Sequence, residues 1–337
     1  MKRKNLIIIV IAGLLAILFF YPRKIILAGS AMGTTYHITI FVPPFTDINK
    51  VKSKIDDTLQ KIDQTMSVFN PDSELSRLNN HISRKPIKVS QDLYQLLVLS
   101  RRVYKLTDGY WDATAKPLID LWCFGNTKEI LLNTPTKKQI IDLRKSVSFD
   151  SLVIMPQQRV KKNIANLSLD LSSIAKGFAV DKISELLNKK NIKHYIVEIG
   201  GELYLSVRSG KRKWSIGIAF PNKDKKSIYK TLYIEKKGIA TSGDYQNYYK
   251  LKNKTYTHII NPKTGYPIIS NIISATVIAP SCAFADGLAT AFMIMSPTQS
   301  IAVLDSLENI DGLILQKTDQ DQVIEFSSKG LYALVEN

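Results

Sequence analysis

Asp286 and Thr290 are a pair of side chains whose types and spacing could support chemistry. They lie four residues apart in an apolar segment, Ala283–Met295, whose pattern predicts a helix, so both side chains face the same way. Carboxylate and hydroxyl oxygens suit Mg²⁺, which takes few protein ligands and completes its shell with water and phosphate oxygens. A structural role is also open, in which the helix dipole favours Asp286 and Thr290 bonds back into its own turn.

The segment Asp170–Gly177 (DLSSIAKG) combines a carboxylate, two serines and a lysine. An apolar run, Leu167–Leu171, predicts a strand that enters a turn of small residues and opens a helix. Free N–H groups at a helix N-terminus attract anions, small residues let a ligand approach the backbone, and Lys176 adds positive charge. The segment therefore predicts a phosphate site, and the alternative is an ordinary helix start with Ser172 as its N-cap.

His258 lies in a short predicted strand, Thr257–Ile260, directly before a turn of composition Asn-Pro-Lys-Thr-Gly. Histidine is the side chain that most readily exchanges a proton near neutral pH, and catalytic groups concentrate on loops. A lone histidine is also commonly structural, so the sequence leaves both roles open.

Glu198 and Glu202 flank a Gly-Gly pair between two apolar runs. The glycines indicate a β-turn or a bulge. Two glutamates this close are compatible with a metal site, but no third ligand lies near them in the sequence. The pattern alone therefore favours a structural turn.

The elements that must position these groups alternate between helices and strand pairs. Apolar residues three and four apart predict helices over Val51–Met66, Leu93–Leu106, Ser173–Leu187 and Ala283–Met295. Strands are predicted over Tyr36–Val42, Tyr195–Ile199, Leu203–Val207, Trp214–Phe220, Ser227–Ile234, Ser274–Ala279, Gly312–Gln316 and Leu331–Val335. Hairpin-like runs with helices between them predict an α+β fold of mixed, mainly antiparallel sheets packed with helices. No long linker appears, which predicts one domain over residues 25–337 behind an N-terminal segment, residues 1–24.

Composition narrows the class of protein. The 337 residues include 45% hydrophobic and 22% charged side chains, which is ordinary for a globular protein. The net charge is +17, yet no nucleic-acid motif accompanies it, so we expect lysines spread over a solvated surface and no nucleic-acid partner. The two cysteines, Cys123 and Cys282, exclude a disulfide framework and leave a single bridge open.

The N-terminus has the pattern of an export signal or membrane anchor. Three basic residues, Lys2–Lys4, precede an apolar run from Leu6 to Tyr21, and Arg23 and Lys24 follow it. As a helix this run spans about 24 Å, slightly short of a hydrocarbon core of about 30 Å. The positive-inside rule predicts that residues 25–337 lie outside the cytoplasm. Ala28-Gly29-Ser30 is a poor cleavage site, so we expect an uncleaved anchor.

Seven motifs taken together resemble the ApbE family of flavin transferases from about Ala31 to the C-terminus. The first three are AMGTTY at Ala31–Tyr36, MSVFNPDSELSRLN at Met66–Asn79 and GYWDAT at Gly109–Thr114. The four patterns described above supply the rest, in the family's order. Three departures stand out: no lipobox cysteine follows the apolar run, Phe69 replaces a frequent tyrosine or tryptophan, and Ala289 replaces an acidic residue of some members.

The resemblance implies a cleft that holds FAD, with roles for twelve residues. Met32, Phe69, Tyr110, Trp111 and Asp112 would line the flavin and adenine sites, Asp170 and Lys176 would fix the adenosine and diphosphate parts, Ile260 would touch the ligand, His258 would be the catalytic base, and Asp286, Thr290 and the backbone oxygen of Ser173 would bind Mg²⁺.

The implied reaction is Mg²⁺-dependent transfer of FMN from FAD to a Thr or Ser hydroxyl of an acceptor protein, with release of AMP. The family's acceptors carry a motif of the type Asp-x-x-Ser/Thr-Gly-Ala-Thr, which this chain lacks. The acceptor is therefore expected to be a separate exported or membrane protein. Two alternatives remain: an FAD pyrophosphatase that releases FMN and AMP, and a non-catalytic, membrane-tethered flavin-binding protein.

Overall fold

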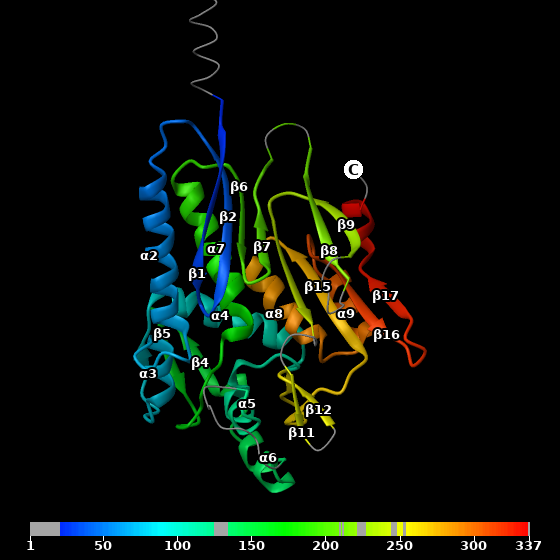
Figure 1. Cartoon of the computed structure of the whole chain (residues 1–337). Helices are drawn as coiled ribbons and strands as arrows, with labels where there is room; N and C mark the ends of the chain where they lie inside the picture. The colour runs from blue at the N-terminus through cyan, green and yellow to red at the C-terminus, as the bar shows by residue number, and fades with distance from the viewer. Residues whose placement is uncertain are drawn as a thin grey trace, which may run out of the picture.

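The computed structural model of the protein describes residues 21–124, 134–208, 210, 212–220, 227–243, 248–251 and 254–335. Its largest element is an eight-stranded sheet in the order β1-β2-β6-β7-β10-β15-β16-β17, in which every neighbouring pair is antiparallel (Figure 1). The strands are β1 (Arg23–Ala31), β2 (Thr34–Val42), β6 (His194–Ile199), β7 (Glu202–Leu205), β10 (Lys237–Gly243), β15 (Ile272–Ala279), β16 (Asp311–Lys317) and β17 (Val323–Ser327).

Smaller sheets and the helices surround this sheet. The small sheets contain β3 (Ile87–Lys88), β5 (Arg159–Lys162) and β4 (Leu152–Met155); β8 (Trp214–Ala219) and β9 (Ile228–Ile234); β11 (Tyr248–Leu251) and β12 (Lys254–Thr257); and β13 (Ile260–Asn261) and β14 (Tyr266–Pro267). The helices are α2 (Ile48–Met66), α3 (Glu74–Asn80), α4 (Gln91–Leu106), α5 (Lys116–Leu121), α6 (Lys137–Arg144), α7 (Ser172–Lys189), α8 (Cys282–Phe292), α9 (Pro297–Asp305) and α10 (Tyr332–Val335), with 3₁₀ turns at Ala113–Ala115, Phe149–Ser151 and Lys329–Leu331.

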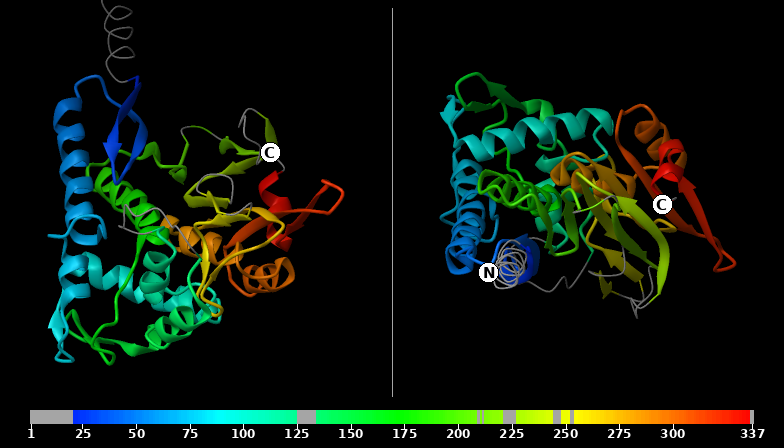
Figure 2. Two further views of the ribbon diagram at one scale, coloured as in Figure 1. Left: turned by 60° about the horizontal axis from the view of Figure 1, so that its bottom comes forward. Right: turned by 90° about the horizontal axis from the view of Figure 1, so that it is seen from above.

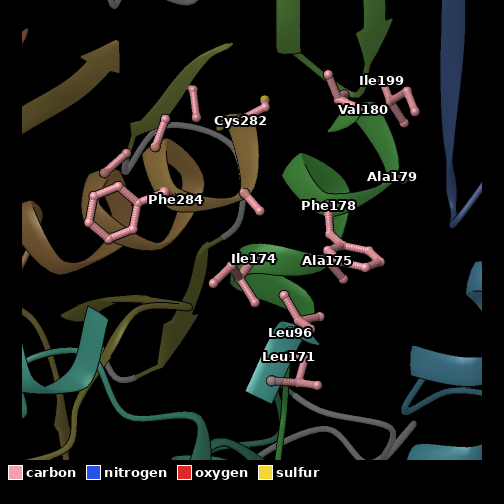
Figure 3. Close-up of a cluster of buried hydrophobic side chains, with 14 of the residues drawn as sticks. Leu96, Leu171, Ile174, Ala175, Phe178, Ala179, Val180, Ile199, Cys282 and Phe284 are labelled. Atoms are coloured by element: carbon pink, nitrogen blue, oxygen red, sulfur yellow. The ribbon is translucent and has the colours of Figure 1, made fainter. Parts of the chain in front are cut away.

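The helices α7 and α8 lie in the middle of the molecule. In Figure 2 the blue β1–β2 hairpin and the red strand β17 lie on opposite sides, with the green α7 and the orange α8 between them. Apolar side chains fill the space around both helices, including Ile174, Phe178 and Phe284 (Figure 3). These two helices are therefore fixed by the main core of the domain.

The central strand β15 is covered on both faces, which explains its nearly continuous apolar sequence. Val277 belongs to the main core, whereas its neighbour Ile278 belongs to a second cluster on the opposite face with Leu232 of β9 and Leu331. Successive side chains of a strand point to opposite faces, so a strand buried on both sides needs apolar residues at every position.

The α+β class and the four predicted helices are confirmed, with ends shifted by up to three residues. The prediction of a strand over Leu167–Leu171 is wrong. Its leucines are buried, but the backbone of Leu169 bonds to the side chain of Asn79 on both its N–H and its C=O, each at 2.8 Å. The segment is therefore held by a side chain instead of a neighbouring strand.

Two other strand predictions need correction. Leu331–Val335 forms the end of a 3₁₀ turn and helix α10, because the backbone N–H of Lys329 bonds to Asp305 and starts a turn that buries Leu331. The last strand of the sheet is β17 instead. Thr257–Ile260 is interrupted by a bend at His258, so that only its first and last residues belong to strands, β12 and β13.

The predicted anchor, Leu6–Tyr21, lies outside the described residues except for Tyr21. In the described ranges, no helix has the length and apolar character needed to cross a membrane. Strand β1 begins at Arg23, and Ala28, Gly29 and Ser30 all lie within it, paired with β2. Both cysteines are free thiols, and burial raises the pKa of the Cys282 thiol well above its usual value.

Candidate active site

One cavity of about 690 Å³ opens between α7, α8, β10 and the β13–β14 hairpin. All twelve residues singled out from the sequence line it: Met32, Phe69, Tyr110, Trp111, Asp112, Asp170, Ser173, Lys176, His258, Ile260, Asp286 and Thr290. They come from segments spread over more than 250 positions of the chain, so the fold brings together what the sequence keeps apart. Their individual roles remain predictions.

The start of α7 forms one end of the cavity. The helix begins at Ser172, and its N-cap is Leu171, so the alternative of Ser172 as N-cap is wrong. Asp170 caps the turn instead, because its Oδ1 accepts hydrogen bonds from the backbone N–H of Ser172, at 2.8 Å, and from the Ser172 hydroxyl. The carboxylate of Asp170 is thus held in place at the cavity lining.

Aromatic side chains form the neighbouring surface. Trp111 is nearly buried and its Nε1 donates to Ser173 Oγ at 2.9 Å, which fixes the indole against the start of α7. The ammonium of Lys263 lies 4.0 Å from the centre of the Tyr110 ring. Phe69 is 60% exposed and lines the cavity, so its ring is open to a flat ligand.

Asp112 organises the segment that follows Trp111. Its Oδ1 accepts from the backbone N–H of Thr114 at 2.8 Å and from the Thr114 hydroxyl at 2.6 Å, and its Oδ2 accepts from the N–H of Phe149 at 3.2 Å. Burial raises the pKa of Asp112 to about 6, although these hydrogen bonds oppose the shift. Asp112 therefore shapes the backbone here as well as lining the cavity.

Met32 reaches the cavity because of the hairpin between β1 and β2. Ala31 pairs with Thr34, so the turn has only two residues, Met32 and Gly33, with φ values of 52° and 73°. Positive φ at both positions is the turn type whose twist matches a hairpin. It leaves the Met32 thioether at the tip of the hairpin, on the cavity lining.

Asp286 and Thr290 lie on one face of α8, as their spacing predicts. Asp286 is 3% exposed, and its Oδ2 accepts from the backbone N–H of Gly177 at 3.1 Å. Burial raises the pKa of Asp286, and the nearby charge of Lys176 opposes this rise. Thr290 Oγ1 lies 3.3 Å from Ser242 Oγ of β10. These oxygens form a small polar patch in the cavity lining.

Lys176 points from α7 to Glu202 at the start of β7, and the two form an ion pair. Burial and the charge of Asp286 raise the pKa of Glu202, and its ion pair with Lys176 opposes this rise. Glu198 points elsewhere: it accepts from the N–H of Gly201 at 2.8 Å and lies 2.8 Å from His37 Nδ1. The two glutamates of the turn therefore do not share a metal site.

His258 is half-buried at the bend between β12 and β13 and lines the cavity, with Ile260 two residues further on. The β13–β14 hairpin that follows is tied to the end of α4 by an ion pair of 2.6 Å between Lys263 and Asp108. A short segment with few residues in strands thus carries the imidazole to the cavity.

Sequence reasoning missed Glu202, Ser242 and Ser274 as cavity residues. The place of Glu202 directly after two glycines is a usable signal in the sequence. Ser242 and Ser274 lie on β10 and β15, whose pairing across the sheet is not visible from periodicity.

Known proteins resemble this chain over most of its length. The sequence model of the ApbE family matches residues 32–314. An FAD:protein FMN transferase of Vibrio cholerae is 37% identical over 308 residues, which cover 91% of each chain. An FAD:protein FMN transferase of Haemophilus influenzae is 33% identical over 314 residues, which cover 91% of this chain and 90% of the relative.

Solved structures of the same family also resemble this chain in fold. The structure of flavin transferase ApbE from Vibrio cholerae matches with a TM-score of 0.83 and 35% identity, and the match covers 93% of this chain and 99% of that chain. The apo form of Pseudomonas stutzeri flavinyl transferase ApbE matches with a TM-score of 0.83 and 28% identity, and covers 94% and 98%. On the match of sequence model, relatives and fold, the chain belongs to the ApbE family.

Proposed function

We propose that this protein transfers FMN from FAD to a Thr or Ser hydroxyl of a separate acceptor protein. The observation that carries the proposal is the single cavity in which a histidine, a lysine, a buried aspartate and aromatic side chains converge. Family membership and relatives named FAD:protein FMN transferase support the same chemistry. A cavity of about 690 Å³ has the usual size of a small-molecule site.

The proposed reaction is a displacement at the FMN phosphorus. The acceptor oxygen forms a bond to that phosphorus, the bond to the bridging oxygen breaks, and AMP leaves with that oxygen. The hydroxyl proton passes to His258, since a hydroxyl is a weak nucleophile until a base removes its proton. Lys176 places positive charge where the diphosphate would lie.

The polar patch on α8 fits Mg²⁺. Asp286 is a buried carboxylate whose ionised form needs a nearby positive charge, and Thr290 adds a hydroxyl oxygen one turn away. Within the described ranges no group of three or more His, Cys, Asp or Glu could hold a metal, so any ion here would rely on few protein ligands. That donor set suits Mg²⁺, with the Ser173 backbone oxygen as a third ligand. Bound there, the ion supplies charge that stabilises the phosphates in the transition state.

We further propose that the N-terminal segment anchors the protein and places the cavity on the extracytoplasmic side of the membrane. The basic flank and apolar run at residues 2–21 support this topology. The acceptor is then an exported or membrane redox protein that carries a Thr or Ser flavinylation motif. A cleavage after Ser30 would remove most of β1, whose pairing with β2 supports the Met32 turn, so retention of the segment agrees with the fold.

The test is to incubate the full-length chain with FAD, Mg²⁺ and a motif-bearing acceptor, and to measure the intact mass of the acceptor and the AMP released. We expect the acceptor to gain one FMN less one water, with one AMP for each modified acceptor. Free FMN and AMP beside an unmodified acceptor would instead identify a pyrophosphatase. Bound FAD without either product would identify a flavin-binding protein.

A further inference from the structure

Glu202 has no role in the reaction described above, yet it lies in the cavity wall. Its side chain is 5% exposed, and Oε1 accepts a hydrogen bond from Lys176 Nζ. Oε2 is buried and has no hydrogen-bond partner among the described residues. A buried carboxylate is costly unless its charge is compensated, so a domain that needed only packing here would favour an apolar side chain.

The turn before Glu202 is shaped to admit the lysine. Gly200 has a φ of 61°, and a Cβ at this position would lie 3.3 Å from Lys176 Cδ and 2.9 Å from Thr34 Cγ2. The stem of Lys176 therefore passes directly over the backbone of Gly200 on its way to Glu202. Gly201, with a φ of 102°, completes a backbone path that a residue with a side chain rarely follows.

Lys176 lies within the electrostatic reach of two carboxylates but bonds to one. The charges of Asp286 and Glu202 both raise the pKa of Lys176. The hydrogen bond goes to Glu202, on the sheet side of the cavity, and Asp286 Oδ2 is bonded to Gly177 instead. A lysine stem is flexible, so without Glu202 the ammonium has other positions available, including one against Asp286.

We propose that Glu202 is a positioning residue: through its ion pair it holds the Lys176 ammonium at the sheet side of the cavity, aimed at the diphosphate of the substrate and away from Asp286. This inference rests on the proposed FMN transfer. It assigns a function to the Gly-Gly-Glu turn, which would otherwise be an ordinary hairpin connection.

A positioning role has a distinct kinetic signature. Loss of the Glu202 charge removes a repulsion from the anionic diphosphate, which offsets the weaker hold on Lys176 in the ground state. The transition state suffers more, because there the ammonium must face the phosphate whose charge is changing. We therefore expect turnover to fall while the affinity for FAD changes little.

The test measures single-turnover flavinylation and FAD affinity of the full-length Glu202→Gln variant, which keeps the shape and one hydrogen bond of the side chain. We expect the flavinylation rate to fall about 10-fold, a coupling of ordinary size between contacting groups, with FAD affinity within about 2-fold of the wild type. Asp92→Asn is the matched control, because Asp92 forms an ion pair of 3.0 Å with another lysine of α7, Lys182, away from the cavity lining. Its flavinylation rate should not change.

Two further comparisons separate positioning from plain structural support. In a Lys176→Met background, Glu202→Gln should lower the rate no further, because Glu202 acts through the lysine. The double reversal Lys176→Glu with Glu202→Lys should recover the melting temperature lost by either single reversal, without recovering the flavinylation rate. Recovery of the rate as well would show that a lysine on either side of the pair serves equally, so that its position does not matter, and would overturn the proposal.

The proposal and the proposed function fail differently. If the wild type does not flavinylate an acceptor, the proposed function fails. If the wild type is active and Glu202→Gln flavinylates at the wild-type rate, or loses FAD affinity and melting temperature in step with its rate, only the positioning role of Glu202 is overturned. Should Glu202→Gln not fold, Glu202→Asp decides instead, because it keeps the charge but shortens the side chain: a lower rate at unchanged FAD affinity supports the positioning role, and a wild-type rate overturns it.

Discussion

Two walls of the cavity are built differently. The helical wall, defined here as helices α7 and α8, has most of its apolar residues in the main core, and Asp181 of α7 accepts from the Ser281 hydroxyl and the N–H groups of Cys282 and Ala283 at 2.7–3.0 Å. The loop wall, defined as His258–Pro262, follows the four-residue strand β12 and contains only the two-residue strand β13. Groups proposed to bind charge thus lie on rigid helices, and the proposed base lies on a segment with little regular structure.

The difference between the two walls indicates that one wall binds the substrate and the metal, and the other carries the base. A phosphate and metal site needs fixed charges, and elements packed on two sides supply them. A base that must meet the hydroxyl of a second protein needs an accessible position near the surface, which a loop provides. Changes in the helical wall are therefore expected to affect FAD and metal binding or stability, and changes in the loop wall only turnover.

The largest expected effect is that of Asp286→Asn. The amide can still accept from the Gly177 N–H, so the fold should persist, but the charge proposed to hold Mg²⁺ is lost. We expect acceptor flavinylation to fall by more than about 10³-fold, the upper end for losing a charge-stabilising group. EDTA should mimic the substitution in the wild type. Wild-type turnover of the variant after metal removal would break the assignment of the helical wall.

Next is His258→Ala in the loop wall. A general base contributes about 10²–10⁴-fold to rate and little to ground-state binding, so we expect flavinylation to fall by about 10²-fold or more. Raising the pH should partly restore the rate, because hydroxide substitutes weakly for the base. A rate that stays flat with pH would argue against proton removal as the lost function.

One pH effect on stability should come from Asp181 of α7. Burial raises the pKa of Asp181 to about 6 from an unfolded value of 3.8. The folded state therefore holds this proton more tightly, and the resulting stability is present below about pH 4 and lost as the pH rises to about 6. The loss is at most about 3 kcal/mol, given about 1.4 kcal/mol per pKa unit. Urea unfolding at pH 4 and pH 7 should show a smaller pH-dependent loss in Asp181→Asn than in the wild type; equal losses would contradict this.

Gly177→Ala should destabilise the helical wall directly. A Cβ there would lie 2.5 Å from the backbone oxygen of Cys282 and 2.7 Å from Ala283 Cα, so α7 and α8 must move apart. Overpacking of this kind costs about 1–3 kcal/mol, which thermal unfolding can measure. An unchanged melting temperature would mean that α7 and α8 are packed too loosely to form the rigid helical wall described above.

The smallest effect is expected beyond the loop wall, at Ile269. Its side chain is 96% exposed, just after β14, so Ile269→Ser removes almost no buried surface. The change in unfolding free energy should stay within about 0.5 kcal/mol. A larger loss in chemical unfolding would show that the region around Ile269 is more tightly packed than the exposure of its side chain indicates.

Periodicity predicted the helical wall well and the loop wall poorly. The spacing of Asp286 and Thr290 correctly put both on one face, because a helix fixes which residues are neighbours. His258 was predicted within a continuous strand, but the chain bends there. Alternation of side chains carries no information on a bend of one residue, which depends on the turn that follows.

Long-range contacts were beyond the sequence patterns. The apolar run Leu167–Leu171 predicted a strand. In the structure, however, the backbone of Leu169 bonds to the side chain of Asn79, ninety residues away. The ion pair between Lys176 and Glu202 also joins segments that are not adjacent in sequence. Only the resemblance to a family predicted that twelve residues would lie in one cavity. Motifs mark residues that are distant in sequence and close in space, and periodicity does not.

The division between the two walls is tested most directly by an FAD titration of His258→Ala, compared with Lys176→Met, under conditions in which the wild type flavinylates its acceptor. The account predicts that His258→Ala binds FAD with an affinity close to that of the wild type while Lys176→Met binds it more weakly. If FAD affinity in His258→Ala instead falls in step with its flavinylation rate, His258 is a ligand or packing residue, and the separation of binding from chemistry is wrong.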